Sequence, residues 1–204
     1  SPYVINLEIS SDWNSWSDYT FGATLTLSNI WDKVYWRNKS YSSVFGENSD
    51  RYYKYSMSGS IAASGNIMYL IGNTGTYTAI PSSYCFYLLF DDCGWLTTPP
   101  KLPATTLNWN CYEYMFRNCA SLVALPELPA TSLTYYCYER MFYWCSQIKL
   151  STTQTWIYQT PYTIPSSWTW TDSDSMTDMF IYTWWTFTGT PTINTTYYTS
   201  NTII

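Results

Sequence analysis

Hydrophobic and polar positions repeat along the middle of the chain with a fixed period. Residues 103–128 read PATTLNWNCYEYMFRNCASLVALPEL, and residues 129–150 follow at once with PATSLTYYCYERMFYWCSQIKL. Cys111 recurs as Cys137, a displacement of 26 residues, and all the other matching positions are displaced by the same number. A third copy lies upstream at residues 80–102. A period in this range indicates structural units that stack on one another.

Each copy has two halves with different local requirements. Residues 111–119, CYEYMFRNC, contain no Gly or Pro and space their apolar residues at i, i+4, i+5 and i+8, which share one helical face. This half is predicted to form a helix of about two turns. Residues 121–129, SLVALPELP, predict a short strand near Leu122 and Leu125 that prolines interrupt. Neither half can bury its apolar side alone, so we expect helix over helix and strand beside parallel strand.

Residues 1–72 lack this repeat and are predicted to form a β-rich N-terminal cap. They precede residues 73–150, which hold the three repeats. An antiparallel β unit would cover the open edge of the stack. An independent β-sandwich is the alternative, although no flexible linker separates it from the repeats. Residues that favour strands cluster in four stretches, at 3–9, 23–29, 33–37 and 51–57.

The period is lost in the last part of the chain, residues 151–204. Residues 151–171 are rich in Thr, Ser, Tyr and Trp and predict a long, partly ordered loop. Met179 and Phe180 then restore the Met-Phe pair of the repeats without the cysteines. We interpret this part as an irregular insertion, a degenerate fourth repeat and a C-terminal cap. Its tail, residues 195–204, predicts either one more edge strand or a linker within a longer chain.

The repeated pattern CYxxMFxxCxSLxxxPxLPATxL resembles the BspA-like leucine-rich repeats found on bacterial surfaces and in phages of gut bacteria. The likeness covers residues 80–150 and, more loosely, 58–70 and 187–201. It implies an α+β fold, a short leucine-rich-repeat solenoid of about 26-residue repeats with parallel short strands, short helices and an N-terminal antiparallel β cap. It also implies binding or adhesion, because known members of the family are mostly of that kind.

Two places depart from the pattern of this family. Trp144 stands where relatives usually carry Gly, and Trp184 and Trp185 stand where Gly-Gly is expected. Two alternative explanations of these departures are a diversified binding face and an error in the deduced sequence.

Composition narrows the class of partner. Only 11% of residues are charged, so Ser, Thr, Asn and Tyr must build the polar surface, which suits an extracellular protein of a cell surface or virion. The net charge of -5 and the lack of a Lys/Arg cluster argue against a nucleic acid partner. Apolar runs such as residues 85–90 are too short to span a bilayer, so no membrane insertion is expected. No signal peptide is visible, and the start at Ser1 without Met suggests a processed or trimmed product.

The cysteines and the absence of His limit the chemistry. Cysteines such as Cys111 and Cys119 lie eight residues apart, which is beyond disulfide reach along a helix, so we predict free thiols filling the core. The chain has no His, the commonest zinc ligand and general base. Asp172, Asp174 and Asp178 offer oxygen ligands for Ca²⁺ but lack the Gly and Glu of an EF-hand, and Asp174 fits a helix N-cap equally well. We predict no cofactor and no metal.

Carboxylates are the remaining candidates for catalysis. Glu113 and Glu139 lie one period apart, as a pair that brackets a glycosidic bond would require. We interpret them instead as surface charges that alternate with arginines on the exposed helix face. Asp91 and Asp92 are interpreted as a solvated helix end. No enzyme activity is predicted.

Aromatic residues make up 21% of the chain, more than a core of this size requires. Residues that differ between the repeats occur at equivalent places, and because the recurring residues are expected to point inward, these are predicted to line an outer face. Tyr, Trp, Asn and Arg together are typical of a recognition surface. The predicted ligand-binding residues are Trp109, Tyr114, Tyr135, Tyr136, Arg140, Tyr143 and Trp144.

These features predict a non-enzymatic binding or adhesion module that recognises a cell-surface glycan or protein through its aromatic face. The alternative is self-association, with the chain as a structural subunit of a surface filament, fibre or virion and the aromatic residues packed between subunits. A carboxylate-dependent glycan hydrolase is a third hypothesis.

Overall fold

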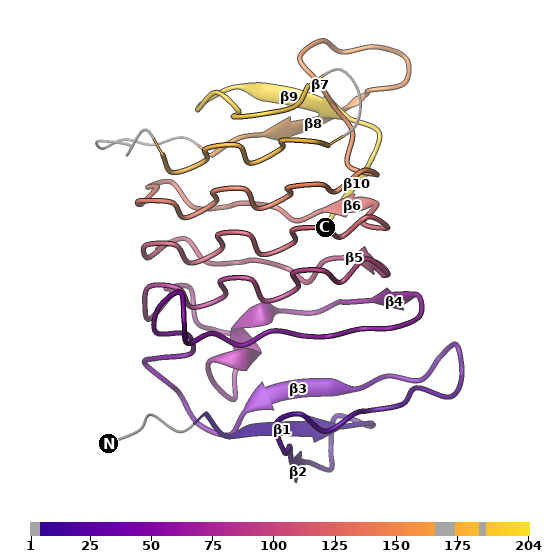
Figure 1. Cartoon of the computed structure of the whole chain (residues 1–204), viewed down its shortest axis with the longest axis vertical. Helices are drawn as coiled ribbons and strands as arrows, with labels where there is room; N and C mark the ends of the chain where they lie inside the picture. Colours follow the sequence, from indigo (N-terminus) through magenta and orange to yellow (C-terminus); the bar gives the residue numbers. More distant parts are fainter. Residues whose placement is uncertain (1–4, 166–173, 184–186) are drawn as a thin grey trace.

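The computed structural model describes residues 5–165, 174–183 and 187–204, which form layers stacked from the N-terminal to the C-terminal end (Figure 1). Within these residues the regular elements are short strands and one 3-10 helix. In chain order they are β1 (Leu7–Ser10), β2 (Ser17–Asp18), β3 (Tyr35–Asn38), β4 (Ile61–Ala62), η1 (Ile67–Leu70), β5 (Leu96–Thr98), β6 (Ala124–Leu125), β7 (Leu150–Ser151), β8 (Thr160–Thr163), β9 (Thr196–Thr199) and β10 (Thr202–Ile203).

The strands form several small sheets instead of one large one. At the N-terminal end β2, β1 and β3 pair in that order as an antiparallel sheet, and at the opposite end β7, β9 and β8 do the same (Figure 1). Two parallel pairs, β4 with β5 and β10 with β6, lie between them. Because β10 pairs with β6, the end of the chain returns to the middle of the stack, where the Ile204 N–H donates to the Leu125 carbonyl at 2.9 Å.

Four stretches of chain share a wavy course, and we call them the turn segments: residues 84–93, 110–119, 136–145 and 174–183. Within a segment every second N–H donates to the carbonyl three residues back, as from Met115 to Tyr112 at 3.2 Å. The N–H groups between these donate to the next segment instead, as from Tyr112 to Cys137 at 3.0 Å. Each segment is therefore joined to its neighbour along its length, as backbone groups removed from water require.

The predicted α+β leucine-rich-repeat solenoid is wrong. The described residues contain no α-helix, and residues 111–119, for which the spacing predicts a two-turn helix, belong to a turn segment. The strands that follow successive turn segments, β5, β6 and β7, lie in three different sheets and not in one parallel sheet. The error has a physical cause, because left-handed bends recur every four residues in these segments and place side chains on one side at nearly the spacing of a helix.

Columns of matching rings build the core between the turn segments. The Phe90 and Phe116 centroids are 5.6 Å apart with the planes 7° from parallel, and Phe116 and Phe142 repeat this at 5.6 Å. Phe180 of the fourth segment continues the column at 5.3 Å from Phe142. All four rings are buried, and each such burial contributes about 1.5–3 kcal/mol. The column fixes the register of one segment over the next.

The six cysteines are free and buried, which confirms the prediction made from their spacing. The thiol of Cys119 donates to the carbonyl of Phe90 at 3.1 Å, and that of Cys145 donates to Phe116 at 2.9 Å. Burial raises the pKa of the Cys93 thiol to about 11. These side chains are protonated at neutral pH and join adjacent segments by packing and weak hydrogen bonds.

The N-terminal strands agree only in part with the strand-forming stretches of the sequence. Stretches 3–9 and 33–37 overlap β1 and β3, whereas 23–29 and 51–57 contain no described strand. Residues 23–29 are exposed throughout, with no neighbouring strand to accept their backbone hydrogen bonds. Strand-forming side chains alone do not make a strand without such a partner.

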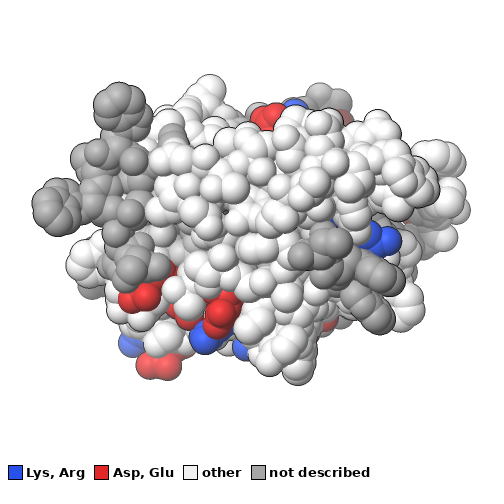
Figure 2. All heavy atoms as spheres, turned by 90° about the horizontal axis from the view of Figure 1, so that it is seen from above, with Lys and Arg blue, Asp and Glu red and all other residues white. Residues whose placement is uncertain are grey.

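One face of the molecule shows few charged side chains. Seen from above, it is mostly uncharged, with the acidic and basic side chains toward the edges of the view (Figure 2). The described residues also contain no helix that is both long and apolar enough to cross a membrane.

Candidate functional site

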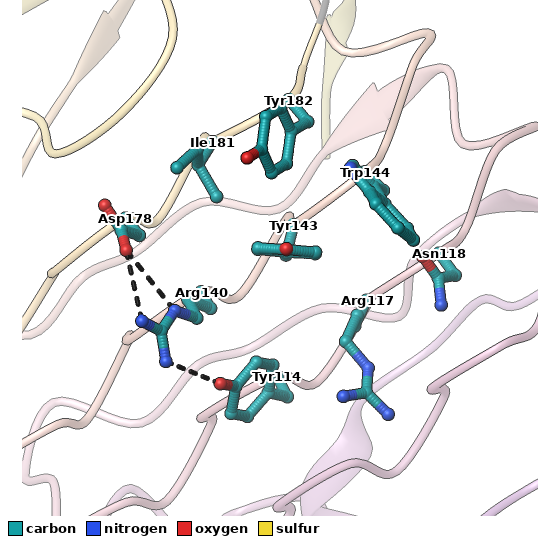
Figure 3. A pocket seen from close by; sticks show the side chains of 9 residues that line it. All are labelled: Tyr114, Arg117, Asn118, Arg140, Tyr143, Trp144, Asp178, Ile181 and Tyr182. Carbon is teal, nitrogen blue, oxygen red and sulfur yellow. Dashed lines mark hydrogen bonds and ion pairs between the residues drawn. The ribbon is translucent and has the colours of Figure 1, made fainter.

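A depression of about 540 Å³ opens on one side of the last three turn segments (Figure 3). Three equivalent positions of each segment line it, so the site arises from the stacking and not from a single loop. In segment order the lining residues are Tyr114, Arg117 and Asn118, then Arg140, Tyr143 and Trp144, then Asp178, Ile181 and Tyr182.

Left-handed backbone is found at most of the lining positions. Two of the three positions in each segment have positive φ, a conformation that costs a non-glycine residue about 1–2 kcal/mol. The residues between the bends, such as Met115 and Phe116, are fully buried. Six of the nine lining residues therefore lie at bends, whereas Arg117, Tyr143 and Ile181 lie between them. The φ values are 55° at Tyr114, 60° at Asn118, 48° at Arg140, 61° at Trp144, 54° at Asp178 and 57° at Tyr182.

Trp144, where the resemblance noted above leads one to expect glycine, lies at one of these bends. Glycine adopts positive φ without a steric penalty, whereas Trp144 holds φ at 61°. The other departures, Trp184 and Trp185, lie outside the described residues.

Three aromatic rings form one wall of the depression. The Tyr143 ring lies 5.2 Å from Trp144 and 5.4 Å from Tyr182, between ring centroids, and it meets Tyr182 edge-on at 89°. Trp144 and Tyr182 are 5.8 Å apart. Trp144 remains 52% exposed and Tyr182 57% exposed. The three rings thus pack against one another, and part of their surface remains open to a ligand. Each ring offers the ligand an apolar face and a polar O–H or N–H group.

Arg140 is held in place by groups from both neighbouring segments (Figure 3). Its Nε and Nη2 donate to one carboxylate oxygen of Asp178 at 3.3 and 3.2 Å. Its Nη1 donates to the hydroxyl of Tyr114 at 2.6 Å and lies 2.9 Å from Glu139 Oε1. The guanidinium is therefore compensated by carboxylates before any ligand binds.

Arg117 is compensated in the same way by the segment on its other side. Its Nε and Nη2 donate to the two oxygens of Asp91 at 2.6 and 2.8 Å, and the Lys54 ammonium donates to Asp91 at 2.7 Å. Asp92 accepts from the side chain of Asn118 at 2.6 Å. The interpretation of this acidic pair as a solvated helix end is wrong for Asp91, which is only 2% exposed and bound to two cations.

Glu113 and Glu139 are not the exposed surface charges that the sequence suggests. They are only 9% and 8% exposed, and the side chain of Asn110 donates to Glu113 at 2.6 Å. Burial, followed by the nearby charge of Glu113, raises the pKa of Glu139 to about 7, although Arg140 opposes this shift. Burial also raises the pKa of Glu113. Such buried carboxylates leave little room for a glycosidic bond to approach them.

The predicted ligand-binding residues fall into two groups. Those that line the depression are Tyr114, Arg140, Tyr143 and Trp144. Those outside its lining are Trp109, Tyr135 and Tyr136. Trp109 is 61% exposed just before its turn segment, and the rings of Tyr135 and Tyr136 contact each other with centroids 3.7 Å apart.

Five residues that line the depression are missing from the predicted ligand-binding residues. Two features of the sequence could have identified them. Arg117 and Asn118 precede Tyr143 and Trp144 by one period of 26 residues, so the repeat itself relates them. Asp178, Ile181 and Tyr182 require the 38-residue offset of the fourth segment, which the Met179-Phe180 pair alone indicates.

No metal centre is assembled in the part of the chain that the structure describes. There, no three His, Cys, Asp or Glu side chains gather closely enough to hold an ion. Of the acidic group considered for Ca²⁺, Asp172 lies outside the described residues and Asp178 is paired with Arg140.

Comparisons of the chain with protein-family models, with curated proteins and with solved structures find no match. The functional argument therefore depends on the depression itself.

Proposed function

We propose that this chain is a non-enzymatic binding module that recognises a cell-surface glycan through the depression on its turn segments. The observation that carries this proposal is the pair of open rings, Trp144 and Tyr182, beside the polar side chains of Arg117, Asn118 and Arg140. A sugar ring has an apolar C–H face that packs on an aromatic ring and hydroxyl groups at its edge that exchange hydrogen bonds. Both kinds of partner occur here side by side.

The size of the site favours a glycan over a folded protein. A volume of about 540 Å³ lies within the range of sites for small ligands, roughly 300–1,000 Å³. A stable protein interface requires about 800 Å² from each partner, which is far larger than the nine residues here provide. A few sugar units at the end or along the side of a glycan chain match the site better.

An extracellular role at a cell surface or virion agrees with the composition of the chain. Only 11% of the residues are charged, so Ser, Thr, Asn and Tyr supply much of the polar character of the chain, and no His is available for the usual acid–base chemistry. The resemblance of the repeated motif to surface repeats of bacteria and phages supports the same role.

The test is glycan binding by the Trp144→Ala variant. Loss of a central stacking ring should weaken binding at least about tenfold, which corresponds to about 1.4 kcal/mol. The matched control is Trp95→Ala, because Trp95 is 59% exposed and does not line the depression. Binding is measured on a glycan array and then by calorimetry, with thermal unfolding to verify that both variants fold. Equal binding by wild type and Trp144→Ala would contradict the proposal.

A further inference from the structure

The charged groups that line the depression are paired with one another or with charged groups just outside its lining. The positive groups are Lys54, Arg117 and Arg140, and the negative groups that contact them are Asp91, Asp92, Asp178 and Glu139. Three positive and four negative groups leave a net charge of -1 when Glu139 is ionised and zero when it is protonated. No uncompensated positive charge therefore remains in this group for an anion.

The arrangement still leaves donors for uncharged oxygen atoms. A guanidinium has five N–H groups, and Arg117 directs Nε and Nη2 to Asp91, so its Nη1 amino group is not part of that bidentate pair. The hydroxyl of Tyr143 and the amide of Asn118 add groups that both donate and accept. Sugar hydroxyls can use this combination, whereas a sulfate or carboxylate binds most strongly where a positive charge is free to pair with it.

We propose that the ligand of the depression is a neutral glycan, and that sulfated and carboxylated glycans are discriminated against. This inference rests on the proposed function and specifies its ligand class. The net charge of -5 on the chain acts in the same direction, because it repels polyanions at low salt. The aromatic wall supplies contact area that does not depend on charge.

The first experiment compares neutral and acidic glycans on one array, with maltohexaose and cellohexaose as neutral probes and sialyllactose and heparin as acidic probes. We expect neutral probes among the bound ones, with a Kd that changes less than about twofold between 0.05 and 0.5 M NaCl, since charge–charge attraction is screened over that range. A different result would overturn this inference and leave the proposed function standing: the acidic probes bind most tightly, their affinity falls in high salt, and their binding is weakened in the Trp144→Ala variant. No bound glycan of either kind would overturn both.

A second variant tests the charge argument directly. Asp178→Asn removes the carboxylate that pairs with Arg140, and Asn tolerates the left-handed backbone there, where φ is 54°. We expect this variant to gain salt-sensitive binding of the acidic probes, severalfold above wild type, while neutral binding changes less. If acidic binding does not rise in a variant that unfolds at the wild-type temperature, charge compensation does not set the ligand class.

Discussion

At the scale of single residues, the candidate site depends on left-handed bends held by residues that do not favour them. Asn118 is a common occupant of such backbone, but Trp144 and Tyr182 are not. Their side chains gain little burial in return, because both remain more than half exposed. Residues that cost stability without contributing to the core are typical of functional sites.

This strain can be measured by comparing two replacements of Trp144. Both Trp144→Gly and Trp144→Ala remove the ring, and Ala is ordinarily the more stable of the two by about 0.5–1 kcal/mol. At φ of 61° the order should reverse, with Gly more stable by about 1 kcal/mol in the free energy of unfolding measured in urea.

The control is the same pair of replacements at Tyr143, a half-buried neighbour that is not among the residues with positive φ. There Ala should be at least as stable as Gly. An Ala variant more stable than the Gly variant at position 144 would show that the bend is not left-handed.

At the scale of elements, the stacking of turn segments brings equivalent side chains together whether or not they attract. It aligns Phe116 with Phe142, which adds buried ring area, and it also brings Glu113 near Glu139, which adds to the effect of burial in disfavouring the charged form of Glu139. The raised pKa of Glu139 thus follows first from burial and then from the repeat, which places Glu113 nearby. One position that recurs in the repeat, that of Glu113 and Glu139, therefore destabilises the folded state when the carboxyl group of Glu139 ionises at high pH.

Stability should therefore fall as the pH rises from about 5 to 8. Glu139 ionises near its ordinary value of 4.5 in the unfolded chain but only near pH 7 in the folded one. The folded state thus binds more protons over this range, and raising the pH favours unfolding. We expect Glu139→Gln to flatten this part of the curve and to stabilise the protein at pH 8 by on the order of 1–3 kcal/mol, the residual slope reflecting Glu113.

The measurement is the unfolding free energy in urea at several pH values for wild type and Glu139→Gln. Asp91→Asn provides a contrast, because it removes a buried carboxylate bound to two cations and should destabilise the protein throughout the range from pH 5 to 8. Identical pH slopes for wild type and Glu139→Gln would refute the assignment of this titration to Glu139.

At the scale of the whole molecule, the period of 26 residues was sufficient to predict which residues stack and that the recurring apolar residues are buried. Cys111, Met115 and Phe116, expected to point inward, are fully buried. The type of backbone could not be predicted, because a four-residue bend and a helix space apolar side chains almost alike. The hydrogen bonds that distinguish them lie between copies and depend on partners distant in the sequence.

The candidate site was predictable to the extent that it follows the repeat. Tyr143 and Trp144 were identified because they differ from their equivalents in the preceding copy. Trp109 differs from its equivalent too, yet it lies outside the depression, because variation alone does not show which outward residues come together. Tyr182 was missed because an insertion of irregular length precedes its segment.

The most direct test of the proposed site is an NMR titration that observes the indole N–H groups of the tryptophans while a neutral oligosaccharide bound on the array is added. The Trp144 resonance is assigned by its disappearance in Trp144→Ala, and those of Trp95 and Trp109 by their own Ala variants. We predict that the Trp144 resonance shifts in a saturable manner while those of Trp95 and Trp109 stay in place. A saturable shift at Trp109 with none at Trp144 would place the binding site elsewhere and contradict the account.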